Sequence, residues 1–264
     1  LNLLDDPAGL AATRWRTAAP MRNAWEQPSS RTGARWTRPD IDVVSAMVCP
    51  RRKAEVLTAA LAAGKHVITD KPLALTPAEA RAVWAAENAS TGRGYMLAGF
   101  QNRPLVRHLA DAIGRGRLGA LRALSLRLCF MGGVFPGFRP SARWRSEIPS
   151  GELTTIGCHA LMTLLKLHPR PVESVYATTA NRFYPEYRAV GAEDWAELNL
   201  RFVDGVVANA MVARLPHRVP REDILIEATG TDGYAQLGAD GLTYWPGPET
   251  LPPPAGVDPQ IGRA

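Results

Sequence analysis

The chain has 264 residues, of which 46% are hydrophobic, so it can bury a sizeable core in one large or two ordinary domains. It contains no run of about 18 apolar residues, and we therefore expect no membrane-spanning helix and no membrane partner. The net charge of +6 comes from basic residues that are scattered singly and are mostly arginine, so it does not indicate a nucleic-acid partner.

The first half of the sequence is predicted to alternate strands with helices. Strands are expected over residues 1–7, 42–48, 65–70 and 94–100. One helix is expected over 50–64, and a second begins at a capping box formed by Thr76 and Glu79. This alternation is typical of a parallel sheet with helices on its faces, and it predicts a Rossmann-like α/β domain over residues 1–101.

Gly114, Gly116 and Gly119 have the GxGxxG spacing of a phosphate-binding loop, but the order of the predicted helix and strand on either side of them is the reverse of that in such a loop. Such a loop follows a strand and precedes a helix, whose amides and dipole hold the phosphate. Here residues 104–113 have helical spacing, and residues 121–130 alternate like a strand. The interpretation we favour is a glycine-rich exit from a helix into the next sheet, with a phosphate loop as the alternative.

The second half, residues 102–264, is predicted to be an α+β domain with a large, mostly antiparallel, open sheet. Strands are expected over 121–130, 173–182, 195–203, 206–214 and 223–228. Asp204 and Gly205 indicate a hairpin between two of these strands, and one helix is expected over 152–167. The proline-rich end, residues 245–264, is predicted to be loop or tail.

The cysteines indicate neither a disulfide framework nor a metal site. Cys49, Cys129 and Cys158 are odd in number, far apart and without CxxC spacing. We therefore expect no metal and a cytoplasmic location. No targeting segment is visible, but the chain begins with Leu1, and we expect a piece upstream of it to be missing.

The stretch GKHVITDKPLALT, residues 64–76, holds the residue that we single out first for chemistry. Lys71 directly follows a predicted parallel strand, at the sheet edge where ligands bind in open α/β sheets. An ammonium at this place, between Asp70 and Pro72, can polarise a substrate oxygen. The alternative is a solvated lysine at a strand end.

Six segments resemble motifs of the glucose-fructose oxidoreductase, inositol dehydrogenase and MocA (Gfo/Idh/MocA) family, and they occur in the family's order. AGKHVITDKPLA resembles the signature AGKHVxxEKPLA, and SGELTTIGCHAL resembles GGGxLxDxGxHxxD. The other four are RPDIDVVSAMV, AGFQNR, IGRGRLGAL and LNLRFVDGVVANAMVA. The resemblance implies an NAD(P)-dependent oxidoreductase that transfers a hydride between a nicotinamide cofactor and a sugar, inositol or related polyol.

The resemblance places Lys71 and His159 beside the nicotinamide as catalytic residues. Hydride leaves a carbinol carbon only as the hydroxyl proton is taken, so a neutral imidazole as base and an ammonium as electrostatic partner suit the step. Thr155 occupies the position of a family aspartate four residues before the histidine, and Met162 replaces a later one. Because Thr155 offers no charge, we expect altered substrate preference or weak activity. The alternative is that His159 has a structural role, with its hydrogen bonds satisfied on a helix face that packs against the sheet.

For the cofactor, the resemblance makes Asp5 or Asp6 the acid that holds the adenosine ribose. An acid there favours NAD over NADP, which stays an alternative, as does a capped helix start. Asp70, Lys71 and Pro72 complete the expected cofactor-binding set. The phosphate loop and first strand would precede Leu1, and the family's last helix and strand would follow the chain's end, so the resemblance implies a fragment.

The expected substrate-binding residues are Asn102, Arg103, Trp144, Arg145 and His159. Relatives pair through the open face of the second sheet, which implies a homodimer or homotetramer with an exposed face of Val, Ala and Leu in VVANAMVARL, residues 206–215. Glu193 and Asp194 are expected to be structural. Two other functions stay open: a relative that senses sugar or dinucleotide without turnover, and an inert fragment.

Overall fold

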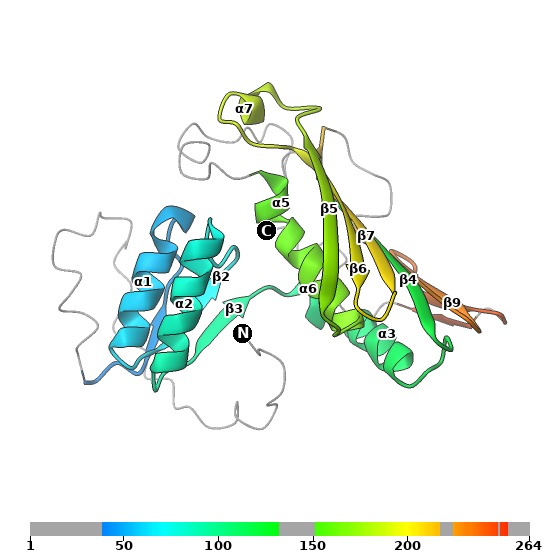
Figure 1. Ribbon diagram of the computed structural model, residues 1–264, viewed down its shortest axis with the longest axis horizontal. Helices are drawn as coiled ribbons and strands as arrows, with labels where there is room; N and C mark the ends of the chain where they lie inside the picture. Colours follow the sequence, from blue (N-terminus) through cyan, green and yellow to red (C-terminus); the bar gives the residue numbers. More distant parts are fainter. Residues whose placement is uncertain (1–38, 132–150, 217–223, 248, 253–264) are drawn as a thin grey trace. The chain divides into compact units, whose positions relative to one another are not determined.

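The computed structural model describes residues 39–131, 151–216, 224–247 and 249–252 (Figure 1). The chain divides into two compact units, Leu1–Leu97 and Ala98–Ala264. No helix of the described part is both long and apolar enough to cross a membrane.

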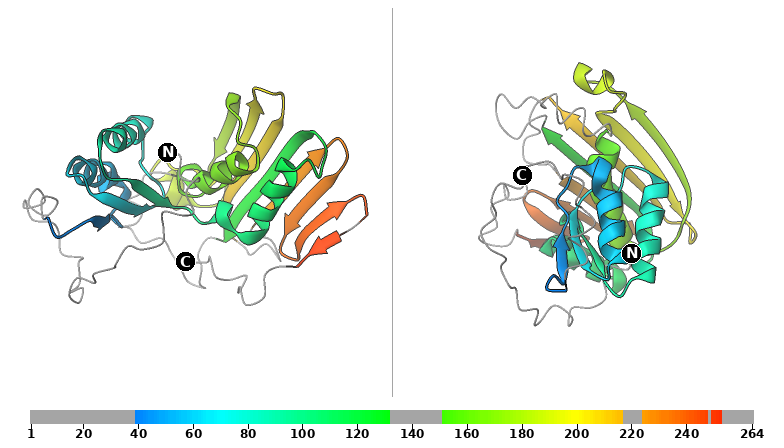
Figure 2. Two further views of the ribbon diagram at one scale, coloured as in Figure 1. Left: turned by 90° about the horizontal axis from the view of Figure 1, so that it is seen from below. Right: turned by 90° about the vertical axis from the view of Figure 1, so that its left-hand side faces the viewer.

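The described part of the first unit alternates strands and helices as predicted. Its elements are β1 (Val43–Ser45), α1 (Pro50–Ala62), β2 (His66–Asp70), α2 (Pro77–Ala89) and β3 (Gly94–Leu97). The three strands pair in parallel in the order β1-β2-β3, and α1 and α2 lie side by side over one face of this sheet (Figures 1 and 2). The predicted strand over residues 1–7 lies outside the described residues.

Local signals explain the bounds of these two helices. Thr76 accepts a hydrogen bond from the Glu79 amide at 3.2 Å while the Glu79 carboxylate accepts from the Thr76 amide at 3.0 Å, so the predicted capping box is confirmed. α1 begins at Pro50 and is followed by Gly64 in a left-handed conformation, at φ 73°. The unit's core is the apolar stripe of α1 packed on the sheet and α2: Val44, Ala46, Val56, Leu57, Ala60, Leu61, Val67 and Val83.

The second unit is built on one large sheet, which has eight strands among the described residues. In chain order its elements are the short helix η2 (Phe100–Asn102), α3 (Pro104–Gly114), β4 (Leu121–Met131), α5 (Glu152–Thr155), α6 (Gly157–Leu167), β5 (Val172–Ala180), α7 (Pro185–Arg188), β6 (Trp195–Phe202), β7 (Val207–Leu215), β8 (Ile224–Gly230), β9 (Tyr234–Gly238), β10 (Gly241–Trp245) and β11 (Glu249–Leu251). The strand order is β11-β10-β9-β8-β4-β7-β6-β5, and each pair is antiparallel except β4 with β7. The predicted α+β architecture is therefore confirmed.

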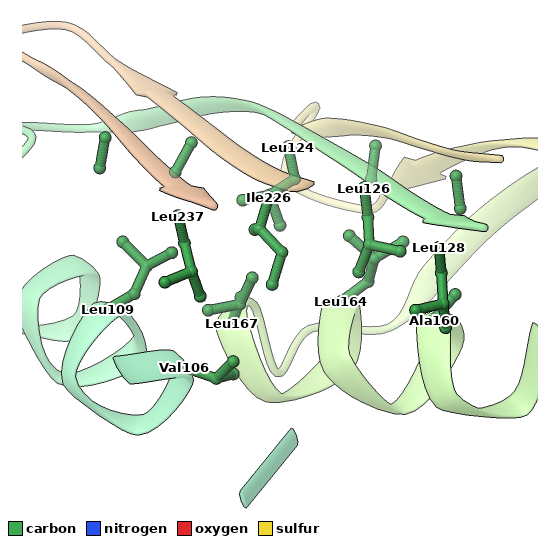
Figure 3. Packing of buried hydrophobic residues seen from close by; sticks show 14 of the residues in the cluster. Val106, Leu109, Leu124, Leu126, Leu128, Ala160, Leu164, Leu167, Ile226 and Leu237 are labelled. Atoms are coloured by element: carbon green, nitrogen blue, oxygen red, sulfur yellow. The ribbon is translucent and has the colours of Figure 1, made fainter. Parts of the chain in front are cut away.

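Helices α3 and α6 cover one face of the large sheet and enclose its core (Figures 2 and 3). Figure 3 shows leucines of β4 meeting Leu164 and Leu167 of α6, with Val106 and Leu109 of α3 beside them. Alternate residues of β4 point into this core, as Leu124, Leu126 and Leu128 are each at most 2% exposed. This is the period of two expected of a strand with one covered face.

The opposite face of the sheet carries a row of mostly polar residues, one from each strand. Cross-strand pairing aligns them across the sheet in the order Tyr176, Asn199, Asn209, Ser125, Glu227, Gln236, Thr243 and Thr250. Several are joined by hydrogen bonds, such as Ser125 to Asn209 at 3.0 Å and Gln236 to Glu227 at 3.2 Å. We call this set the open-face row. The prediction that β7 exposes Val, Ala and Leu is partly wrong, because Ala208, Ala210 and Val212 face the helices.

The glycine-rich stretch joins a helix to a strand and is not a phosphate loop. α3 ends at Gly114, and β4 begins at Leu121. Gly116 and Gly119 between them have φ of 74° and 70°, which L side chains rarely adopt. The favoured interpretation is confirmed.

Three predicted elements need correction. The strand expected over 94–100 ends at Leu97, and η2 follows it. The helix expected over 152–167 is interrupted at Ile156. β9 and β10 were not predicted, and β11 lies inside the segment expected to be loop or tail.

Candidate functional site

The structure places Lys71 at the carboxyl edge of the small parallel sheet. β2 ends at Asp70, which is paired with Leu97 at the end of β3, and Lys71 is the next residue. Its peptide bond to Pro72 is cis. Helices α1 and α2 both begin on the carboxyl side of the strands that precede them. Helix N-termini favour anionic groups, and open α/β sheets bind dinucleotides at this edge, so these residues fit a nicotinamide dinucleotide.

A buried lysine on α1, which the sequence reasoning missed, holds Asp70. Lys53 is 0% exposed, and its ammonium forms an ion pair with the Asp70 carboxylate. The same Nζ donates to the Asp70 main-chain carbonyl at 2.9 Å. Asp70 itself is half exposed, so its carboxylate has both a buried partner and access to solvent.

His159 lies near the start of α6, in the second unit, and is buried at 7% exposure. Its ring packs against Phe100 of η2, with centroids 4.6 Å apart and planes at 58°. On the same phenyl ring lies the Arg103 guanidinium, whose Cζ is 4.3 Å from the centroid. The structure thus brings two predicted site residues, His159 and Arg103, to one aromatic ring. The role of Phe100 was not predicted, although it belongs to the AGFQNR motif.

Thr155 and His159 do not lie on one uninterrupted helix, contrary to the single helix predicted over residues 152–167. Thr155 is the last residue of α5, and Ile156, at φ −113°, separates it from α6. The His159 amide consequently donates to the Ile156 carbonyl three residues back, at 2.9 Å. Both side chains are buried, Thr155 at 8% exposure.

The start of α5 is fixed by a buried ionic cluster, also missed from the sequence. Arg214 of β7 donates to both carboxylate oxygens of Glu152, at 3.0 and 3.2 Å, and the Tyr187 hydroxyl donates to the same carboxylate. Glu152 is 0% exposed. Burial, followed by the charge of Glu152, raises the pKa of Tyr187 well above its usual range. Tyr187 is therefore a neutral hydrogen-bond donor at any physiological pH.

Two further acids fix the neighbouring backbone, as the sequence predicted for a structural pair. The Glu193 carboxylate accepts from the Leu153 amide at 2.9 Å, and a Cβ on Gly151 would lie 2.0 Å from its Cδ. A side chain at residue 151 would therefore displace the Glu193 carboxylate from its present position. Asp194 is fully buried and accepts from three successive amides, those of residues 182–184.

The structure describes only some of the remaining predicted site residues. Asn102 is exposed on η2. Asp5, Asp6, Trp144 and Arg145 lie outside the described residues. Lys71 belongs to the first unit and His159 to the second. Within the described ranges, no group of three or more His, Cys, Asp or Glu side chains is arranged to hold a metal ion.

Two family models match successive parts of the chain. The first describes an oxidoreductase family with an NAD-binding Rossmann fold and matches residues 9–97. The second describes the GFO/IDH/MocA C-terminal domain and matches residues 106–236.

Curated relatives include sugar reductases and dehydrogenases. The chain is 32% identical over 174 residues to a 1,5-anhydro-D-fructose reductase of Ensifer adhaerens, an alignment that covers 64% of this chain and 50% of the relative. It is 30% identical over 163 residues to a D-xylose dehydrogenase of Paenarthrobacter nicotinovorans, covering 59% and 40%. The chain thus spans about half or less of the length of these relatives.

Solved structures share the fold. A levoglucosan dehydrogenase in complex with NADH and levoglucosan has a TM-score of 0.76 at 23% identity, covering 89% of this chain and 71% of that one. An inositol dehydrogenase homologue of Azotobacter vinelandii in complex with NADH and myo-inositol has a TM-score of 0.71 at 21% identity, covering 86% and 61%. Together with the two family models and the described folds of both units, these likenesses lead to one conclusion: the chain belongs to the Gfo/Idh/MocA family of oxidoreductases.

Proposed function

We propose that the protein is an NAD-dependent oxidoreductase that interconverts a carbinol and a carbonyl on a sugar or polyol. The observation that carries this proposal is that successive parts of one chain match the NAD-binding and C-terminal models of the same oxidoreductase family. The names of the relatives support the substrate class, since they include an anhydrosugar reductase, a xylose dehydrogenase and a structure with bound myo-inositol. NADP is the alternative cofactor.

Within this function, Lys71 and His159 are proposed to act on the substrate hydroxyl. In the oxidative direction, the imidazole of His159 accepts the hydroxyl proton, the oxygen keeps the electron pair of the broken O–H bond and forms the carbonyl, and the ammonium of Lys71 stabilises that oxygen. A bound NAD would supply the hydride acceptor for the same carbon. The lysine's place directly after a parallel strand supports its role, because ligands of open α/β sheets bind there.

Phe100 and Arg103 are proposed to set the orientation of His159. The phenyl ring packs on the imidazole, and the guanidinium on the same phenyl ring places a fixed positive charge nearby.

The other site residues keep their predicted roles as proposals. Asp5 or Asp6 binds the adenosine ribose, and Asp70 and Pro72 shape the cofactor edge beside Lys71. Asn102, Trp144 and Arg145 bind the substrate together with Arg103 and His159. We also propose that the protein works in the cytoplasm, on the cysteine pattern of the sequence.

The non-catalytic alternative, sensing of a sugar or dinucleotide, is motivated by Thr155 and Met162, which stand where the family has aspartates. A threonine cannot offer charge to an imidazolium, and the break at Ile156 separates it from the helix that carries His159. Dinucleotide binding by calorimetry without hydride transfer to or from any tested sugar would support this alternative.

We propose in addition that two copies pair through the open-face row. The row crosses the whole described sheet, no described helix covers it, and Tyr176 at its β5 end is 67% exposed. Asn209→Arg places a charge near the middle of the row and should convert a dimer to monomers in light scattering. Asp111→Arg, on the exposed side of α3, is the control and should leave the assembly unchanged.

The test of the function is substrate-dependent NADH formation by the protein expressed from its complete gene. The probes are D-xylose, levoglucosan and myo-inositol for oxidation, and 1,5-anhydro-D-fructose for reduction. Lys71→Met should lower turnover by about 100-fold or more, the scale reported for removing one preorganised electrostatic group. Lys65→Met, at the opposite end of the same strand, is the matched control. Full turnover by Lys71→Met would refute the role of Lys71.

A further inference from the structure

We propose that Glu152 and Arg214 are positioning residues for His159: their buried pair fixes the start of α5, from which two main-chain hydrogen bonds lead to the His159 backbone. The inference rests on the proposed function of His159 as the base. The roles above use neither residue of the pair, and both lie in the same unit as His159.

The link from Glu152 to His159 runs through the main chain of one residue, Ile156. The Glu152 carbonyl accepts from the Ile156 amide at 2.7 Å, and the Ile156 carbonyl accepts from the His159 amide at 2.9 Å. His159 is therefore two hydrogen bonds away from the residue whose side chain the buried cluster holds. A displacement of Glu152 would move both bonds and, with them, the His159 backbone.

The first turn of α6 depends on this link because the helix has no side-chain cap. Ile156 is its N-cap residue, and an isoleucine side chain has no oxygen to accept from the amides of the first turn. His159 is the third residue of α6 and lies within that turn. Helix ends fray more easily than helix interiors, so the contacts of α5 contribute to keeping this turn in place.

Glu152 is held by contacts from three other segments of the second unit. Arg214 of β7 donates to both of its carboxylate oxygens, at 3.0 and 3.2 Å, and the Tyr187 hydroxyl of α7 donates to the same carboxylate. The Glu152 amide donates to the Glu193 carbonyl at 3.0 Å. A planar guanidinium with two bonds to a carboxylate fixes the direction of that carboxylate, whereas an ammonium acts as a point charge.

Stability alone does not require an ion pair at this place. The side chain of Glu152 is 0% exposed and that of Arg214 is 18% exposed. Two apolar side chains of similar volume commonly stabilise such a position as well or better, because removing two charges from water is costly. Apolar packing has no preferred direction, however, and a bidentate pair does. We therefore assign the pair to fixing the direction of α5 and, through Ile156, the place of His159.

The decisive variant is the double variant Glu152→Leu, Arg214→Leu in the full-length protein, because it removes the directional contact and leaves no buried charge. It should lower kcat by about 10- to 100-fold, since a displacement of about 1 Å can cost about 100-fold. Turnover is counted per NAD-binding site titrated by calorimetry, so that unfolded protein is not counted. The affinity for NAD should be unchanged, because the NAD-binding model matches residues 9–97 in the first unit. The exposed pair of Arg117 and Glu249, with both residues replaced by leucine, is the matched control and should keep the wild-type kcat.

A second readout reports the place of His159 without turnover. The chain has five histidines, so ¹³C-labelled histidine gives a spectrum in which His159→Gln assigns the His159 signal. The Phe100 ring, whose centroid is 4.6 Å from that of the imidazole, shifts this signal, and a displacement of either ring changes the shift. The His159 signal should move in the double variant, while that of His66, in the first unit, stays in place. An unmoved His159 signal would overturn the proposal even if kcat falls.

A conservative replacement decides the question if the double variant does not fold. Arg214→Lys keeps a positive charge beside Glu152 but cannot form the bidentate contact. A lowered kcat together with a moved His159 signal in this variant supports the proposal. Wild-type kcat or an unmoved signal overturns it.

The outcomes separate this inference from the function on which it rests. If His159→Gln keeps full turnover, the proposed role of His159 as base fails, whereas the spectra still report whether the pair sets its place. If His159→Gln is inactive but the double variant keeps the wild-type kcat, only the positioning role fails.

Discussion

Removal of the Arg214 side chain should expose how strongly the start of α5 depends on its buried cluster. In Arg214→Leu, the carboxylate of Glu152 stays fully buried but loses two hydrogen bonds, of 3.0 and 3.2 Å, and its positive partner. Breaking a buried ion pair by removing one partner costs about 3 to 5 kcal/mol. The Tyr187 hydroxyl remains as a donor to Glu152, so we expect a cost of about 3 kcal/mol, at the lower end.

The assay is urea unfolding followed by circular dichroism, with the free energy taken from the midpoint and slope. The double variant Glu152→Leu, Arg214→Leu is the control, because replacing both partners by apolar groups leaves no buried charge and should cost much less than Arg214→Leu. The reasoning is refuted if the loss of unfolding free energy in the double variant equals the sum of the losses measured for Glu152→Leu and Arg214→Leu singly. A single-variant cost below about 1 kcal/mol, as for an exposed pair, would also refute it.

Two further predictions test local features of the second unit. Gly119→Ala should lower the free energy of unfolding by more than about 1 kcal/mol, because φ is 70° and a Cβ would lie 2.2 Å from the Thr231 hydroxyl oxygen. Gly116→Ala is the control: φ is 74°, but a Cβ there would have no atom within 4 Å. It should cost less in the same urea assay. At Asp204, burial raises the carboxyl pKa, but the hydrogen bond with His168, the hydrogen bond from the Val206 amide and the charge of His168 act together against it, and the pKa is lowered. A carboxyl pKa lowered in the folded state adds stability that is present above the unfolded value of about 4 and is lost as pH falls through the folded value. The urea midpoint of Asp204→Asn should therefore change less than that of the wild type on acidification below about pH 4, and equal changes would contradict the contact.

Much of the fold was predictable because its signals are local. The capping box of Thr76 and Glu79 lies within four residues, and the period of two in β4 distinguishes its covered face from its open face. The glycines between α3 and β4 were assigned correctly because the helix and strand beside them have opposite periods.

The missed elements depend on contacts between distant residues. Residues 154–157 are three β-branched residues and a glycine, which are poor helix formers, but the contacts that fasten the short helix before Ile156 come from Glu193 and Arg214, both far along the chain. β9 and β10 have five residues each and β11 has three, so their local pattern is short and it is pairing within the sheet that distinguishes them from loop.

The sequence singles out candidate site residues one by one, but not the residues that contact and support them. The motifs predict Lys71 and His159 as site residues, whereas the sequence around Lys53 indicates only a solvated lysine in the first turn of a helix. Seventeen positions separate it from Asp70, and only the crossover from β1 through α1 to β2 joins them. The sequence likewise gives no reason to assign Phe100 to the site, and only the fold shows its contact with His159.

Transfer of carbon-bound deuterium tests the central claim most directly. The full-length protein is incubated with NAD and myo-inositol or D-xylose that carries deuterium on its carbinol carbons, and the reduced cofactor is examined by mass spectrometry. An oxidoreductase of the proposed kind yields deuterated NADH with at least one such polyol, and Lys71→Met yields almost none. Cofactor binding without any deuterium transfer across the sugars and polyols tested would contradict the account and favour the sensing alternative.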